Sequence, residues 1–206
     1  MTTSISVSDG RSRSAAVGAI ALAVAAFLIL LLSYSSEPLA PLRLLSLALA
    51  FFAAWSFCDE LGMSQPLNRA GLVFFAIAAG AKVQVVLGVA PGVAGRYYLL
   101  YAGFVLAAVL FWSVTLLHRQ RTVRVIGAVG VAATLAPIVA LVVGHLVVGT
   151  GAFLGVGALL SATQGAAPTN LGFVTLIERV FGVWGFFAAS LLWRGDIRPA
   201  SQRREA

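Results

Sequence analysis

AAVGAIALAVAAFLILLLSY, residues 15–34, is a long stretch of the chain without a charged side chain. A helix needs about 20 mostly apolar residues to cross the roughly 30 Å hydrocarbon core of a bilayer. The stretch therefore predicts a membrane-spanning helix. Arg11 and Arg13 precede it, as basic residues precede the apolar part of a signal peptide, but the run is too long and no cleavage site of small residues follows. We expect this helix to be retained.

Five more apolar stretches of similar length follow. They cover residues 38–57, 70–90, 97–117, 125–148 and 171–193. The 206 residues are 60% hydrophobic and only 10% charged, whereas soluble domains carry about 25% charged residues. The sequence therefore predicts an all-α fold, a polytopic bundle of six transmembrane helices. This single domain, residues 15–193, lies between a disordered cytoplasmic leader at 1–14 and a basic cytoplasmic tail at 194–206.

The arginines are distributed unevenly between the two sides of the predicted bundle. If the N-terminus is cytoplasmic, the cytoplasmic segments hold Arg11, Arg13, Arg69, Arg119, Arg121, Arg124, Arg194, Arg198, Arg203 and Arg204. The outer segments hold Arg43 and Arg96. Since basic residues accumulate in cytoplasmic loops, both termini are predicted to be cytoplasmic. The same rule accounts for the net charge of +7. Because no nucleic-acid-binding motif is present, we expect no nucleic-acid partner.

Residues 149–164 are apolar enough to resemble a further helix, but the segment is short and rich in glycine. A seventh span would place the basic tail outside the cell. We therefore expect a short re-entrant or interfacial segment on the outer face, between the fifth and sixth spans. Pro91 and Pro168 are predicted to end their neighbouring helices.

A few polar residues inside or at the ends of the spans are the candidate ligand-binding residues. They are Arg43, Lys82, Gln84, His145, Glu178 and Arg179. An ionised side chain at the centre of a transmembrane helix costs roughly 2.5–3.5 kcal/mol, so such residues face the bundle interior, pair, or line a wet cavity. All of these candidates are predicted to lie in the outer half of the membrane.

The direction of each helix separates Lys82 from Arg179. Side chains lean toward the N-terminus of their helix, so Arg179 on the last span can extend to the outer surface. Lys82 leans toward the membrane centre and needs a partner or a pocket. Glu178 is its obvious partner, because it is the only acid deep in a span. The group can bind a headgroup, an ion or a proton, or it can be a buried ion pair that only fixes helix packing.

Other residue types point to no cofactor and no metal. Cys58 is the only cysteine, so Cys-x-x-Cys motifs are excluded. His145 has no second histidine inside the spans to share a metal or haem. Asp59 and Glu60 are adjacent at a helix end, where a solvated pair is favoured over a site. The aromatic residues near predicted span ends are interpreted as interfacial anchors. These are Trp55, Tyr97, Tyr98, Tyr101, Trp112 and Trp193.

The last span reads LGFVTLIERVFGVW over residues 171–184. A Glu-Arg pair one-third of the way into a final apolar helix, followed by aromatic residues and a basic tail, resembles the six-helix membrane proteins of bacteria and archaea grouped as domain of unknown function 998. The resemblance implies six helices and an important role for Glu178 and Arg179, and it implies no particular reaction. We expect a multi-pass protein of a bacterial inner (plasma) membrane.

Three functions are compatible with these residues. The first is a non-enzymatic binding, accessory or transport-related bundle whose polar cluster engages an anionic lipid headgroup or a small solute. The second is an intramembrane enzyme acting on a lipid-linked substrate, with Glu178 as acid or base and Arg43, Arg96 and Arg179 holding phosphate. The third is a packing subunit with a membrane-protein partner, supported by the small residues Gly127, Gly130, Gly182 and Gly185.

Overall fold

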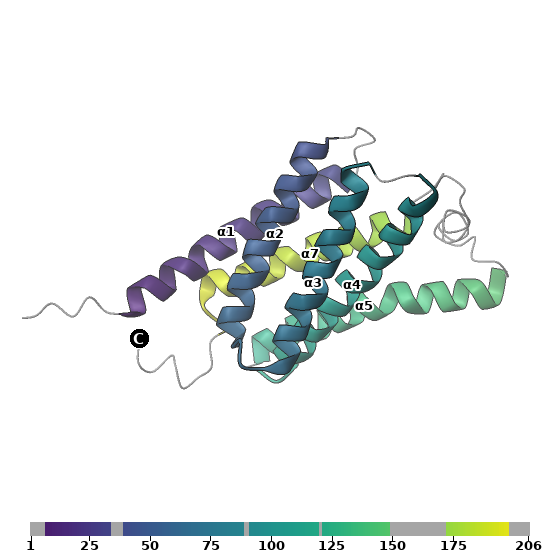
Figure 1. Ribbon diagram of the computed structural model, residues 1–206. Coiled ribbons are helices and arrows are strands. Elements are labelled where there is room, and N and C mark those ends of the chain that lie inside the picture. Colours follow the sequence, from purple (N-terminus) through teal and green to yellow (C-terminus); the bar gives the residue numbers. More distant parts are fainter. Residues whose placement is uncertain (1–6, 34–38, 89–90, 120, 149–171, 198–206) are drawn as a thin grey trace, which may run out of the picture.

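The computed structural model describes residues 7–33, 39–88, 91–119, 121–148 and 172–197. These residues form six α-helices and no strand (Figure 1). The helices are α1 (Val7–Ser33), α2 (Ala40–Leu61), α3 (Pro66–Val86), α4 (Pro91–Leu117), α5 (Arg121–Val148) and α7 (Gly172–Arg194). Each of the six is long and apolar enough to cross a membrane. The predicted six-span helical bundle is confirmed.

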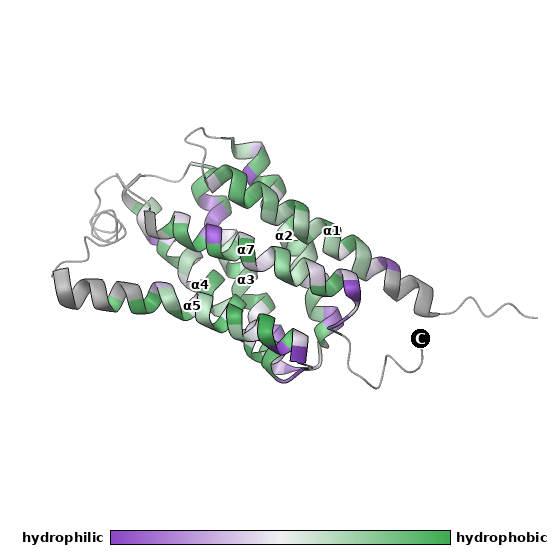
Figure 2. Cartoon of the chain, turned by 180° about the vertical axis from the view of Figure 1, so that it is seen from behind, coloured by the Kyte–Doolittle hydropathy of each residue, from purple (hydrophilic) through white to green (hydrophobic). Residues whose placement is uncertain are grey.

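Helix α7 contacts four other helices and leaves one face, with Val183, Phe186 and Phe187, exposed. It packs against α1, α5 and α4, and it also touches α2, while α3 packs mainly on α4 and α2. Apolar side chains cover most of the helix surfaces, and hydrophilic residues gather toward the helix ends (Figure 2). One end, the basic end, carries Arg69, Arg119, Arg121, Arg124 and Arg194; the opposite end carries Arg43 and Arg96. The arginine rule predicts that the opposite end faces outward.

The boundary between the third and fourth spans differs from the predicted one. Helix α3 begins at Pro66 and ends at Val86, and Gly88 then adopts a φ of 85°. Pro91 begins α4, so the prediction that Pro91 closes a helix was wrong. The reason is that the first turn of a helix contains backbone N–H groups with no intrahelical acceptor, so a residue without an N–H loses nothing there.

The first and last described helices extend to residues that the sequence placed in the flanking segments. Helix α1 begins at Val7, so residues 7–14 are helical rather than disordered; extending a helix that already exists is inexpensive. At the other end, the N–H of Gly195 donates to the carbonyl of Leu192 and that of Asp196 to Leu191, which closes α7 with a Schellman motif. Ile197 is then buried against the core. Residues 149–164 and Pro168 lie outside the described residues.

Four glycines of α5 and α7 are packed against other helices of the same chain. A Cβ on Gly127 would lie 2.7 Å from the carbonyl oxygen of Ser113, and one on Gly130 would overlap Ser113 itself. A Cβ on Gly182 would lie 2.7 Å from Cγ of Leu30, and Gly185 faces α1 in the same way. The small residues therefore bring α5 onto α4 and α7 onto α1, and they no longer argue for a protein partner.

Replacing Gly127 by alanine is expected to destabilise the bundle by about 1–3 kcal/mol, because the new methyl group meets backbone atoms of α4 that cannot rotate away. Gly80→Ala is the matched control, since a Cβ there has nothing within 4 Å. Thermal unfolding in detergent measures both variants. Equal melting temperatures for the two variants would contradict this account of the α4–α5 contact.

The orientation can be tested with thiol labelling, because Cys58 is fully buried and gives little background. Arg96→Cys is expected to react with a membrane-impermeant maleimide in intact cells, and His118→Cys only after permeabilisation. Both positions are exposed in the structure. The reverse pattern would overturn the assignment of the basic end to the cytoplasm.

Candidate functional site

A buried ion pair joins the third helix to the last. The ammonium of Lys82 lies 2.5 Å from Oε1 of Glu178, and the two side chains are only 6% and 13% exposed. Lys82 lies about 6 Å from the end of α3 at 1.5 Å per residue. The pair is therefore close to the opposite end of the bundle, and the structure brings together the two residues that the sequence singled out.

Two tyrosines of α4 cover the ammonium of Lys82. Its Nζ lies 4.8 Å from the ring centroid of Tyr101 and 5.1 Å from that of Tyr98. A cation over an aromatic face is attracted by the negative charge of the ring face, and the attraction is strongest where water is excluded. Tyr101 is only 3% exposed. Lys82 is therefore held by a carboxylate on one helix and by two rings on another.

A small cavity lies beside the pair. Its wall combines polar side chains from α2, α3 and α7, a tyrosine from α4, and apolar side chains from α1 and α2. The lining residues are Ile29, Leu32, Arg43, Ser46, Leu47, Lys82, Tyr101 and Glu178. The space open to the centre of a water molecule is about 20 Å³, which is enough for about one water. The cavity has polar walls but no room for a headgroup inside it.

The positive charge of Arg43 is not balanced within this cluster. Lys82 and Arg43 bring two cations to a cavity that contains one carboxylate, Glu178. The Nε atom of Arg43 is buried and has no hydrogen-bond partner among the described residues. Arg43 is itself half-buried, and Ser46 Oγ donates to its backbone carbonyl at 2.8 Å. The arrangement therefore favours an additional anionic group next to Arg43.

Aromatic rings close the cluster on the side of the basic end. Phe75 of α3 and Phe181 of α7 stack with centroids 5.5 Å apart. Trp112 and Trp184 stack at 6.0 Å, and Phe57 packs edge-on against both. Since Phe75 and Phe181 lie one to two turns from Lys82 and Glu178 on the same helices, the rings form an apolar floor. These rings separate the cluster from the basic end of the bundle.

Two of the predicted site residues are not brought into the cluster. Gln84 is exposed and does not line the cavity, because two residues on a helix are about 200° apart and Lys82 already faces inward. Gln84 as a ligand-binding residue therefore stays a prediction, separate from the cavity beside Lys82. His145 belongs to α5, but its side chain lies outside the described residues.

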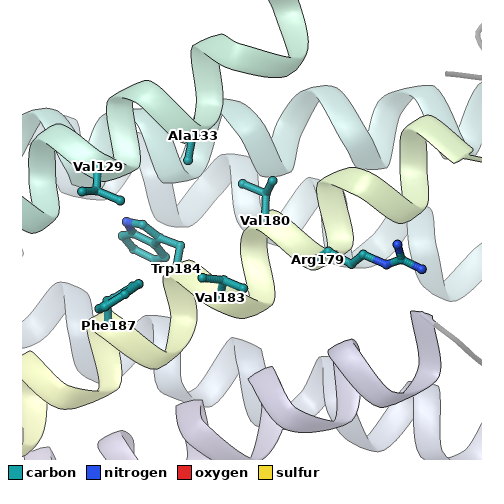
Figure 3. Close-up of a pocket in the computed structure, with 7 residues that line it drawn as sticks. All are labelled: Val129, Ala133, Arg179, Val180, Val183, Trp184 and Phe187. Atoms are coloured by element: carbon teal, nitrogen blue, oxygen red, sulfur yellow. The ribbon is translucent and has the colours of Figure 1, made fainter. Parts of the chain in front are cut away.

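Arg179 lies beside a separate groove between α5 and α7. The groove has a volume of about 250 Å³ and is lined by Val129, Ala133, Arg179, Val180, Val183, Trp184 and Phe187. In Figure 3, Arg179 lies at the far end of the groove from Trp184, and its guanidinium is directed along α7 toward the start of the helix. This is the direction predicted for an arginine that extends toward the outer surface. Arg179 does not line the Lys82–Glu178 cavity.

Sequence reasoning missed the roles of three aromatic residues. Tyr98 and Tyr101 were interpreted as interfacial anchors, yet they contact Lys82. Trp112 was interpreted in the same way but is only 2% exposed, in contact with Phe57, Phe75 and Trp184. The spacing of the tyrosines, three residues apart and therefore on one helix face, is a signal for a shared contact. Trp55 and Trp193 are exposed, 53% and 65%, as anchors would be.

No family model, curated protein or solved structure matches the chain. The resemblance to domain of unknown function 998 therefore stays a prediction. Among the residues that the structure describes, no three His, Cys, Asp or Glu side chains are grouped as a metal site would require.

Removing one member of the buried pair is expected to cost about 3–5 kcal/mol, because it leaves an uncompensated charge, whereas replacing both members with apolar residues is close to neutral. Lys82→Met and Glu178→Leu should each lower the free energy of unfolding in detergent, and the double variant should recover most of the loss. Gln84→Met, at an exposed position of the same helix, is the control. Additive losses in the double variant would show that the two charges are not coupled.

Proposed function

We propose that this integral membrane protein is a non-enzymatic binding protein whose polar cluster at the outer end of the bundle receives a small anionic group. The observation that carries the proposal is the unpaired, buried Nε of Arg43 beside a cavity with two cations and one carboxylate. The anion is the phosphate of an outer-leaflet lipid headgroup or a small anionic solute. Both present the oxygen acceptors that a guanidinium binds best.

The size of the cavity supports binding at its mouth. Space for about one water beside Glu178 cannot contain a phosphate together with a second reactant. Arg43 is only half-buried as a residue although its Nε is buried, so we take it as the group of the cluster that a ligand approaches from the membrane surface. Lys82 and Glu178 form the base of the cluster, and a water in the cavity can connect them to the bound anion.

The alternatives from the sequence are less well supported. An intramembrane enzyme needs room for substrate next to Glu178, whose Oε1 is already engaged by Lys82. A transporter needs a polar path, and the stacked rings of Phe75 and Phe181 lie directly beneath the pair. The glycines that suggested a subunit of a larger complex pack within the chain. Binding of an anion at the outer end of the bundle, without catalysis or transport, is the simplest remaining function.

The proposal predicts that an anion stabilises the purified protein and that Arg43→Gln removes this stabilisation. A ligand at about 100 times its dissociation constant raises the free energy of unfolding by about 2.7 kcal/mol. Inorganic phosphate and short-chain phosphatidylglycerol, titrated separately in neutral detergent, distinguish a free anion from a lipid headgroup. Tryptophan fluorescence reports the melting temperature.

Arg194→Gln is the control for non-specific attraction, because this exposed arginine lies at the basic end. It should keep the full ligand-induced shift. The proposal fails if neither probe shifts the melting temperature of the unmodified protein, or if Arg43→Gln responds as the unmodified protein does.

A further inference from the structure

A second groove runs along the outside of the bundle, on the α3–α4 face. Its volume is about 620 Å³, within the usual range of ligand pockets. Apart from Arg96 at its outer end, all of its lining residues are apolar or glycine. It shares no lining residue with the Lys82–Glu178 cavity.

The floor of this groove is a glycine. A Cβ built on Gly103 has no atom within 4 Å, so the groove is open above this residue and a side chain at position 103 would enter it. Phe74 of α3 and Phe104 of α4, with ring centroids 5.4 Å apart, form part of its wall. The groove is therefore an open, apolar depression along the helix surface.

The length of the groove matches one leaflet of a bilayer. Its α4 residues run from Arg96 to Ala107, about 16 Å along the helix at 1.5 Å per residue. Half of the roughly 30 Å hydrocarbon core is about the same length. An acyl chain that begins at the membrane surface beside Arg96 would thus lie along the whole groove and end near the membrane centre.

The positive charge of Arg96 at the outer end of the groove favours an occupant with an anionic headgroup. Arg96 is exposed, and no carboxylate pairs with it among the described residues. A guanidinium at the level of the headgroups binds a phosphate with two parallel hydrogen bonds. From these contacts we infer that the α3–α4 groove is a specific phospholipid site: one acyl chain lies over Gly103 and the lipid phosphate contacts Arg96.

A second copy of the chain is the main competing occupant. Gly103 and Ala107 are small residues four positions apart, a spacing that permits close helix packing. A two-fold dimer through this groove would place the same surface of both copies face to face. The two Arg96 side chains would then approach each other, and like charges repel. A phospholipid can cover the apolar groove with its acyl chain and pair with Arg96 through its phosphate, so the lining of the groove favours a lipid over a second copy.

The test uses native mass spectrometry of the full-length protein released from detergent with dioleoyl phosphatidylglycerol as the probe. In Gly103→Leu the new Cβ meets no atom of the protein within 4 Å, and the leucine side chain occupies the groove. Because it displaces several methylene groups of the lipid, it should weaken retention of the lipid adduct about tenfold. Gly80→Leu is the matched control: it makes the same change at another exposed helical glycine with nothing within 4 Å and should retain the adduct. Arg96→Gln should weaken retention as well.

The outcomes are distinguishable. Full retention by Gly103→Leu or by Arg96→Gln would overturn the site. A dimer in the unmodified protein that Gly103→Leu converts to monomers would assign the groove to a second copy and also overturn it. The groove and the Arg43 cavity share no lining residue, so Arg43→Gln should keep the adduct that Gly103→Leu and Arg96→Gln weaken. If the anion at Arg43 is also a lipid phosphate, the unmodified protein should carry two adducts, and the Arg43 and Gly103 variants should each lose one and keep the other. The failure of this inference is therefore separate from the failure of the anion site at Arg43.

Discussion

An ammonium group surrounded by hydrocarbon needs an opposite charge nearby. In this bundle the requirement links α3 to α7. Lys82 meets it by reaching Glu178 on α7. Helices α3 and α7 are not among the closely packed helix pairs, so they meet chiefly through this ion pair and through the stacked rings of Phe75 and Phe181. The pair thus sets the position of α7 relative to α3, and the cavity beside Arg43 depends on it.

The two proposed sites use the same chemistry in different surroundings. Arg43 lies inside the bundle next to a polar cavity large enough for about one water, whereas Arg96 lies outside it, above an apolar groove of about 620 Å³. Both arginines are at the end with few basic residues. At this end few other basic residues compete for phosphate, so each arginine is a more selective phosphate contact than an arginine at the basic end.

Sequence reasoning located the spans well because hydrocarbon thickness sets the length of an apolar helix. It also identified the Lys82–Glu178 pair, because no other acid lies deep in a span. The end of α3 was misplaced because the residues between Val86 and Pro91 are as apolar as a span, and the backbone conformation of Gly88 ends the helix. The inward faces of Tyr101 and Trp112 depend on how α4 is rotated against α3 and α7, which residue type does not reveal.

The position of α7 late in the chain has a consequence for biosynthesis. The partner of Lys82 lies 96 positions later in the chain, so at a translation rate of 5–20 residues per second the ribosome delivers it after roughly 5–20 s. During that interval Lys82 has no Glu178 beside it, and the surfaces of α1, α4 and α5 on which α7 packs are not yet covered by it. Completion of the fold is therefore a late event, in which the last helix packs onto helices made before it and brings the carboxylate that pairs with Lys82.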